Sequence, residues 1–201
     1  MKFASVKIRV LLGIIIPLLI MAGGVTGTAV WKMRATAIED FTAKSEQELS
    51  LFGLYISQML RTGQDTARAL AADVAVRNGL GKFPNFVKNT QETPYRHADL
   101  SPEAGAIAAR LLNMQQAQKH FAEVFIGYSD GSYATSFPDI AVPAGTDMST
   151  RSWYRECAAA SGDTTVSSVY QTLQKALAIS LSTKVTGPDG GLVACSASTS
   201  R

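Results

Sequence analysis

The chain has 201 residues, a hydrophobic fraction of 46% and a formal net charge of +3. This length allows one medium-sized domain with an anchor, or two small lobes, and so weak a positive charge does not indicate a nucleic-acid-binding protein. The two cysteines, Cys157 and Cys195, and the two histidines, His97 and His120, lack the spacing of metal-binding motifs. The sequence therefore predicts neither a metal site nor another cofactor.

Residues 10–31 contain no charged side chain and predict a transmembrane helix. At a rise of about 1.5 Å per residue this segment is about 33 Å long, which matches a bilayer core of about 30 Å. Positive charges at Lys2, Lys7 and Arg9 favour a cytoplasmic location for residues 1–9. We therefore expect a single-pass protein of the cell inner membrane, with the residues beyond the span in the periplasm.

A cleaved signal peptide is the alternative interpretation of the same segment. Leu11–Ala22 would be its apolar region, and the small residues of Gly23–Val30 would hold the cleavage site. The apolar run continues into sequence compatible with a helix and shows no turn signal, which favours the uncleaved anchor.

Residues 32–78 predict a long stalk helix. This segment contains no proline, and its apolar residues recur every three or four positions along one face. The residues of that face are Ile38, Phe41, Ser45, Leu49, Phe52, Ile56 and Met59. The pattern is typical of a helix packed along a sensor domain, and it is compatible with a homodimer formed through the stalk.

The remainder of the chain predicts a mixed α+β lobe. Residues 79–101 form an expected loop, and a helix begins at Pro102 with Ser101 as its N-terminal cap. Strands are expected at 120–128 and 132–137, because Asp130-Gly131 between two β-rich runs is a strong hairpin signal.

The second half of the lobe continues with a short helix and further antiparallel strands. After a loop at 138–148, residues 150–160 predict the helix, and 164–170 and 176–185 predict the strands, with a turn at 188–191. The expected fold class is α+β: a transmembrane helix, a long stalk helix and an antiparallel sheet lobe.

Three segments carry a resemblance to a known family. The order GYSDGSY, TRSWYREC and SSVYQTLQKALAISLSTKV resembles the double Cache sensor domain of bacterial chemoreceptors and related transmembrane sensors. The resemblance implies PAS-like lobes after a long helix, with the ligand in the membrane-distal lobe, here residues 79–193. Arg151, Trp153 and Tyr154 look like the family's R-x-W-Y ligand segment, and Tyr170 looks like its downstream pocket tyrosine.

The resemblance also implies roles for these residues. In members that bind amino acids, the arginine and tryptophan hold the ligand carboxylate, while tyrosines and aspartates hold its ammonium. A guanidinium suits this role because its planar fork grips a carboxylate with two hydrogen bonds. This chain departs from the pattern at Thr146, where a tyrosine is expected, and at Thr172, where an aspartate is expected. The predicted ligand is therefore a small carboxylate more than an amino acid.

The predicted ligand-binding residues are Arg151, Trp153, Tyr154, Tyr170, Asp147 and Thr172. Two structural interpretations compete with this prediction. Arg151 can pair at the surface with Asp147 or Glu156, and Trp153 can be an ordinary core residue.

The end of the chain departs further from the family. A strand of the type GVLGVDLT, with an aspartate that closes the pocket, is expected after Val193, but the chain reads ACSASTSR. One set of codons for these residues, read in the neighbouring frame, encodes the expected strand. We therefore expect 194–201 to be an aberrant tail, the lobe to be incomplete at its C-terminus, and the chain to be a frameshifted or truncated receptor fragment.

The predicted function is the extracytoplasmic ligand-sensing portion of a chemoreceptor. The alternatives are the sensor portion of a histidine kinase or cyclic-dinucleotide enzyme, and a membrane-anchored interaction protein without a ligand. An enzyme is not predicted, because the sequence lacks a GxSxG elbow, an HExxH motif and a glycine-rich phosphate loop.

Overall fold

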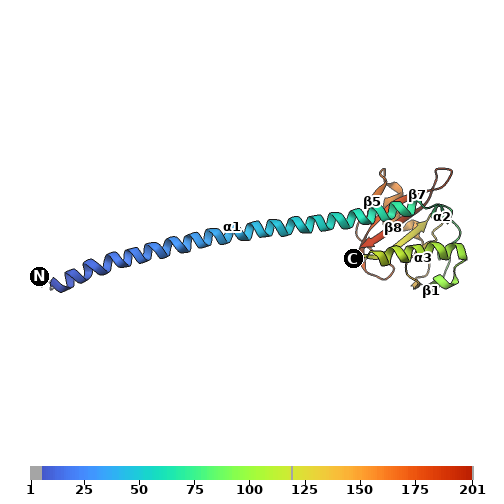
Figure 1. Cartoon of the computed structure of the whole chain (residues 1–201). Helices are drawn as coiled ribbons and strands as arrows, with labels where there is room; N and C mark the ends of the chain where they lie inside the picture. Colours follow the sequence, from blue (N-terminus) through green and yellow to red (C-terminus); the bar gives the residue numbers. More distant parts are fainter. Residues whose placement is uncertain (1–5, 119, 201) are drawn as a thin grey trace. The chain divides into compact units, whose positions relative to one another are not determined.

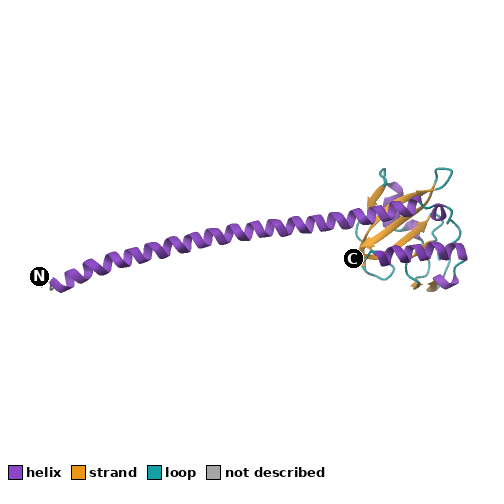
Figure 2. Ribbon diagram, in the orientation of Figure 1, coloured by secondary structure: helices purple, strands orange, loops and turns teal. Residues whose placement is uncertain are grey.

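The computed structural model describes residues 6–118 and 120–200, so the features expected at residues 1–5 and at Arg201 lie outside the described residues. Its first element is the helix α1, Val6–Ala72, which continues without interruption through the predicted span and stalk (Figures 1 and 2). The chain divides into two compact units, residues 1–55 and 56–201.

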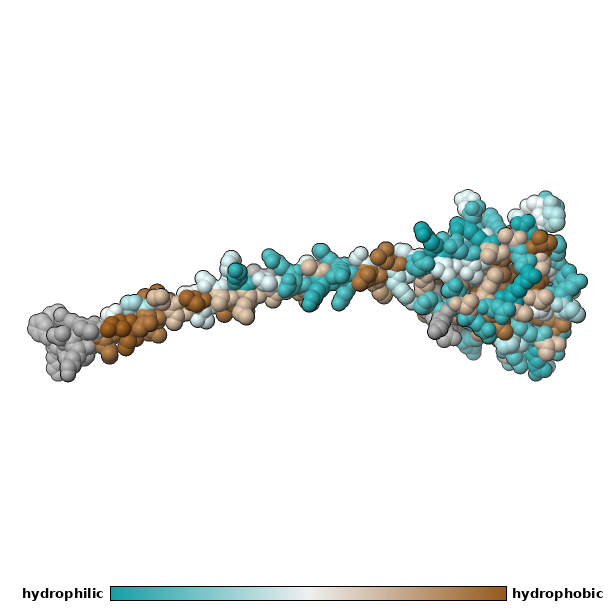
Figure 3. All heavy atoms as spheres, viewed as in Figure 1, coloured by the Kyte–Doolittle hydropathy of each residue, from teal (hydrophilic) through white to brown (hydrophobic). Residues whose placement is uncertain are grey.

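The first unit contains the apolar part of α1. Among the described residues, α1 is the one helix long and apolar enough to cross a membrane. Its large apolar side chains at Leu11 and from Ile14 to Trp31 are exposed, and Figure 3 shows a brown stretch along this part of the helix. Ile38, Phe41, Leu49 and Phe52 on the predicted stalk face are exposed as well.

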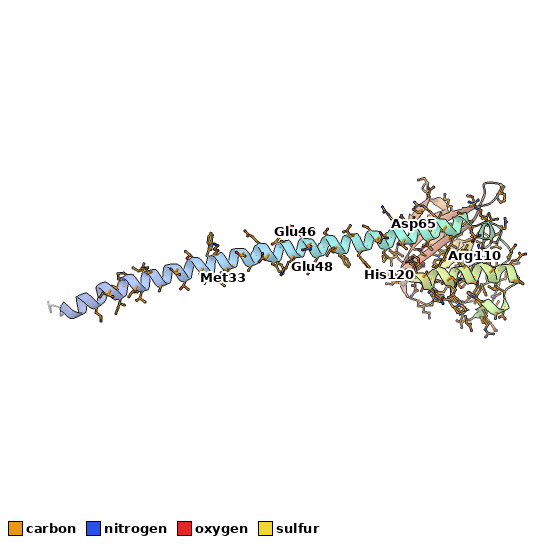
Figure 4. The ribbon with its side chains drawn as sticks, viewed as in Figure 1. Met33, Glu46, Glu48, Asp65, Arg110 and His120 are labelled. Atoms are coloured by element: carbon orange, nitrogen blue, oxygen red, sulfur yellow. The ribbon has the colours of Figure 1, made fainter. Side chains whose placement is uncertain are left out.

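The helix α1 ends six residues earlier than expected, at Ala72. Asp73 leaves the helical conformation with φ −70° and ψ 122°, and its carboxylate accepts a hydrogen bond from the backbone N–H of Ala75 at 2.8 Å. This N-cap starts the short helix α2, Val74–Arg77. Asp73 also pairs with Arg110, which is labelled in Figure 4.

The second unit is built on an antiparallel sheet in the order β3-β2-β8-β7-β5, with β6 paired to β7. Its strands are β2 (Phe121–Tyr128), β3 (Tyr133–Thr135), β5 (Thr164–Val166), β6 (Tyr170–Gln171), β7 (Leu177–Thr186) and β8 (Leu192–Ser200). The α+β fold class predicted from the sequence is confirmed.

The two faces of this sheet have different cores. Alternate residues of β2 and β8 point to opposite faces, as the two-residue period of a strand requires. Val124, Ile126 and Ala194 pack with the end of α1, with α2 and with the helix α3, Pro102–Ala117. Phe125, Cys195 and Ala197 pack with the helix α4, Ser152–Ala159. The predicted binding segment lies on this second face.

Residues 194–200, which we expected to belong to an aberrant tail, are part of a regular strand. Residues 192–200 form β8, which pairs with β2 on one side and with β7 on the other. The serine-rich composition suits this place, because Ser196 Oγ donates to Ala67 O at 2.8 Å and Ser198 Oγ donates to Gly63 O at 3.4 Å. Small side chains thus let α1 approach the sheet, and their hydroxyls find backbone acceptors.

The compact unit consequently begins at Ile56, earlier than the boundary at residue 79 that the sequence indicated. The last turns of α1 belong to it, as the contacts of Ala67 and Gly63 with β8 show. Figure 1 shows this green end of α1 beside β7 and β8.

A second, two-stranded sheet lies in segments expected to be loops. It pairs β1, Thr93–Arg96, with β4, Asp139–Val142. Pro94 lies within β1, which disguises this strand in the sequence, because proline is confined to edge positions of sheets. The buried ring of Tyr95 lies 6.1 Å from the ring of Tyr133 and so connects this small sheet to the second face of the main sheet.

The strand expected at 164–170 is divided into β5 and β6, whereas the caps and turns near Ser101, Gly131 and Arg151 lie where the sequence indicated. Ser101 caps α3, with its Oγ accepting from the backbone N–H of Ala104 at 3.3 Å. The β2–β3 hairpin turns at Gly131, whose φ is +85°. The helix α4 follows a short 3-10 turn, η2 (Met148–Thr150), and is preceded by Arg151, which makes no side-chain cap.

Candidate functional site

Four of the six predicted ligand-binding residues line one small cavity on the second face of the sheet. They are Arg151, Trp153, Tyr170 and Thr172, and the other lining residues are Glu123, Phe125, Tyr133, Met148 and Leu173. The volume open to the centres of water molecules is about 20 Å³. A single water needs about 10–15 Å³ by this measure, so a larger ligand requires the cavity to widen.

Trp153 forms one wall of this cavity and is 1% exposed. It begins the first turn of α4, and its ring lies edge-on to Phe125 with the ring centroids 4.8 Å apart. Gly127 on β2 permits this approach, because a Cβ there would lie 2.7 Å from Trp153 Cη2. Trp153 is therefore both a buried core residue and part of the cavity wall.

Arg151 is half-buried at the edge of the cavity. Its guanidinium donates to the backbone carbonyl of Gln171 and lies 5.9 Å from the centroid of the Tyr170 ring. The two surface partners suggested for Arg151 bond elsewhere: Asp147 accepts from Ser149, and Glu156 accepts from the backbone N–H of Ser168. The cation faces β6 across the cavity mouth.

Tyr170 lines the cavity and contacts the strands β7 and β8 of the main sheet. Its hydroxyl lies 2.5 Å from Ser180 Oγ and 3.2 Å from Thr199 Oγ1. Burial raises the pKa of Tyr170; these hydrogen bonds and the charge of Arg151 lower it, while the charge of Glu123 raises it. Tyr170 therefore lies within electrostatic reach of both the cation and the carboxylate of the cavity.

Thr172 begins the hairpin loop between β6 and β7. Its backbone N–H donates to Ala176 O at 2.8 Å, and its Oγ1 accepts from the backbone N–H of Ala176 at 3.2 Å. Lys175 in this loop has a φ of +63°, in the left-handed region that favours glycine. The loop carries Thr172 and Leu173 to the cavity.

Tyr154 and Asp147 lie outside the set of residues that line the cavity. The Tyr154 ring packs behind Trp153, with ring centroids 5.7 Å apart, and burial raises its pKa. Asp147 caps the η2 turn, accepting from the backbone N–H of Ser149 at 2.9 Å and from its Oγ at 2.6 Å. In this structure both residues support the segment that carries Arg151 and Trp153.

Glu123 is the cavity residue that the sequence analysis missed. It lies on β2 and is 6% exposed, and its Oε1 accepts from the Tyr133 hydroxyl and from Thr135 Oγ1, the latter at 2.6 Å. Burial raises the pKa of this carboxyl to about 7, although both hydrogen bonds lower it. The available signal was an acidic residue in the middle of an apolar strand.

The site therefore places a half-buried cation and a buried carboxylate around one apolar-walled cavity. Such an arrangement can bind a small polar molecule through charge-assisted hydrogen bonds, which are about twice as strong as neutral ones. Within residues 6–118 and 120–200, no three His, Cys, Asp or Glu side chains are grouped to hold a metal ion.

No protein-family model and no curated protein sequence matches the chain. Three solved structures to which it is similar are ligand-binding domains of bacterial chemoreceptors. For Campylobacter jejuni Tlp3, in complex with L-valine, the identity is 18% and the TM-score 0.49, covering 72% of this chain and 53% of the other. For Pseudomonas fluorescens CtaA, in complex with L-leucine, these values are 17%, 0.49, 73% and 50%.

For Pseudomonas aeruginosa PctB, in complex with L-Arg, the identity is 19%, the TM-score 0.46, and the coverage 73% of this chain and 50% of that domain. The chain thus spans about half the length of these solved domains.

Proposed function

We propose that this chain is the extracytoplasmic ligand-sensing portion of a transmembrane chemoreceptor. The observation that carries the proposal is the convergence of Arg151, Trp153, Tyr170 and Thr172 on one cavity. Arg151 immediately precedes α4, Trp153 lies in α4, and the other two come from β6 and the loop after it. Together they resemble a small-molecule pocket with apolar walls and few polar groups.

The ligand in this proposal is a small carboxylate or an amino acid. Arg151 would exchange its bond to the Gln171 carbonyl for a bidentate bond to the ligand carboxylate. This exchange would free the β6–β7 loop to move and would widen the cavity. The sensor portion of a histidine kinase or cyclic-dinucleotide enzyme would use the same site.

The anchor and the stalk complete the proposal. The apolar part of α1 would cross the inner membrane once, with residues 56–201 in the periplasm. A second copy would cover the exposed apolar side chains of Ile38, Phe41, Leu49 and Phe52, which otherwise face water. Cysteine cross-linking of Ser45→Cys in membranes tests this, and a cross-link yield equal to that of an exposed cysteine on α3 excludes the dimer.

Ligand screening tests the central claim. The full chain in detergent micelles would be screened by thermal shift against small carboxylates, amino acids and amines. The Arg151→Ala variant should abolish any stabilisation, and Arg155→Ala is its matched control, because Arg155 carries the same charge on α4 and is exposed. If no compound stabilises the protein, the alternative of an anchored interaction protein replaces the sensor.

A further inference from the structure

A second cavity adjoins the first. Its volume is about 160 Å³, and Glu123 and Thr172 line both cavities. The other residues that line it are Ala122, Phe137, Gln174, Ala176, Leu177, Ala178 and Thr199. An apolar cavity of about 150 Å³ accommodates a molecule as large as benzene, so the space suits about four to six carbon atoms.

The walls of the second cavity favour an aliphatic occupant. Three alanines, Phe137 and Leu177 supply apolar surface, and Glu123 is the one ionisable side chain among the residues that line it. An organic anion would therefore meet like charge there, whereas an aliphatic cation would meet both apolar contact and an opposite charge.

Glu123 is suited to hold that cation. Both of its hydrogen bonds described above come from neutral hydroxyls and go to Oε1. A buried carboxylate with neutral partners is costly in its charged form, as the raised pKa of Glu123 indicates. A primary ammonium beside it would supply the missing opposite charge.

Arg151 lines the first cavity but not the second, and it is already bonded to the Gln171 carbonyl. Its guanidinium is thus available to a ligand carboxylate only after an exchange of partners, whereas the second cavity is already open. The geometry favours an anchor at Glu123 for the cationic and aliphatic part of the ligand.

We propose that Glu123 and the second cavity form a subsite for an alkylammonium group, with the ammonium on the Glu123 carboxylate and the alkyl chain between Phe137 and Leu177. This inference rests on the proposed ligand-sensing function and deepens it. The alkylammonium can belong to a simple amine or to an amino acid whose carboxylate reaches Arg151.

Four compounds of related shape test the subsite and distinguish these sources. Leucine carries both charged groups, 3-methylbutylamine lacks the carboxylate, 4-methylpentanoate lacks the ammonium, and glycine lacks the alkyl chain. Affinities would be measured by calorimetry on the full chain in micelles. Leucine should bind roughly tenfold to a hundredfold more tightly than 4-methylpentanoate, as expected for a hydrogen bond to a charged group. If 3-methylbutylamine binds as tightly as leucine, the ligand of the subsite is a simple amine. If leucine binds more tightly, the ligand is an amino acid.

The Glu123→Gln variant keeps the side-chain shape and removes the charge. It should lower the affinity for leucine or 3-methylbutylamine by the same roughly tenfold to hundredfold factor. The affinity for 4-methylpentanoate should not change. Should this variant not fold, the comparison of the four compounds on the unaltered chain decides the matter.

Two outcomes overturn the subsite while leaving the sensor function intact. If 4-methylpentanoate binds as tightly as leucine, the ammonium is not recognised, and if glycine binds as tightly as leucine, the second cavity does not hold the alkyl chain. If none of these compounds and no other small molecule binds, the proposed function itself fails.

Discussion

The buried carboxylate of Glu123 accepts a hydrogen bond from the hydroxyl of Tyr133 on the adjacent strand β3. Burial raises the pKa of both groups. The cavity thus contains an acid that titrates near neutrality beside a phenol that stays protonated there. We therefore expect the stability of the domain, and the binding of an ammonium ligand at Glu123, to depend on pH.

The first prediction concerns stability. The pKa of Glu123 is about 7 in the folded protein against 4.5 for the ordinary carboxyl, so the folded state holds the proton more tightly. Its stabilising contribution is therefore complete below about pH 4.5 and is lost as pH rises to about 7. The loss should be roughly 3 kcal/mol.

Urea unfolding of the full chain in micelles at a series of pH values measures this effect. The Glu123→Gln variant should lack it, so that the difference in unfolding free energy between the two proteins changes across this range and is constant above it. Parallel pH curves for the two proteins would refute the assignment.

The second prediction concerns binding. An alkylammonium ligand pairs with the ionised form of Glu123, so its affinity should rise with pH up to about 7 and level off above. The raised pKa values of Tyr133 and Tyr170 keep both phenols neutral over this range. Calorimetry at pH 5, 6, 7 and 8 (roughly two units below the pKa to one unit above it) measures the change. A flat profile would remove Glu123 from the binding site.

The third prediction concerns the wall formed by Trp153. In Gly127→Ala the added methyl group would lie 2.7 Å from Trp153 Cη2 and 3.0 Å from Met148 Cβ. The variant should lose about 1–3 kcal/mol of unfolding free energy, as overpacked cores do. It should also lower the affinity for any ligand that binds in the cavity.

Gly105→Ala on α3 is the matched control, because no atom lies within 4 Å of a Cβ added there. It should be neutral or gain up to about 1 kcal/mol, since alanine is the better helix former. Unfolding followed by tryptophan fluorescence compares the two variants, and equal stabilities would show that Gly127 does not limit the packing.

The fourth prediction concerns the loop between the two cavities. Lys175 has a φ of +63°, which is unfavourable for a residue with a Cβ. Lys175→Gly should therefore stabilise the protein by about 0.5–1 kcal/mol. Gln174→Gly, one position earlier, serves as control and should be neutral or destabilising. A loss of stability in Lys175→Gly would contradict the backbone geometry.

The sequence predicts most of the regular elements of the second unit. The cap at Ser101 and the turn at Asp130-Gly131 depend on neighbouring residues alone, and both form as predicted. The small sheet of β1 and β4 was not predictable in the same way, because Pro94 and polar neighbours conceal a pairing between residues far apart in the chain.

The strand β8 shows a different limit. Its sequence, Ala194-Cys-Ser-Ala-Ser-Thr199, is polar by composition, yet all six residues are buried. Hydropathy alone predicts that serine is exposed. The helix carbonyls that accept hydrogen bonds from Ser196 and Ser198 are more than 100 residues away in the sequence. Only the assembled fold brings donor and acceptor together.

The candidate site likewise contains residues that the sequence indicated and one that only the fold reveals. The resemblance to a known motif indicated Arg151, Trp153, Tyr170 and Thr172 together, and the structure places them around one cavity. Glu123 belongs to no motif in the sequence and enters the cavity only because β2 turns that side of the strand toward α4. Asp147 shows the converse, since its nearness in sequence to Arg151 does not bring it to the cavity.

The two serine bonds from β8 to α1 fix the position of the helix along the sheet. Ser196 and Ser198 hold carbonyls one helical turn apart, and a Cβ at Gly63 would lie 2.3 Å from Leu181 Cδ1. Sliding α1 by a turn of about 5.4 Å would break both bonds at once. Thr199, the next residue after Ser198, lines the second cavity. A molecule that displaced β8 from there would therefore act on α1 through the two serine bonds.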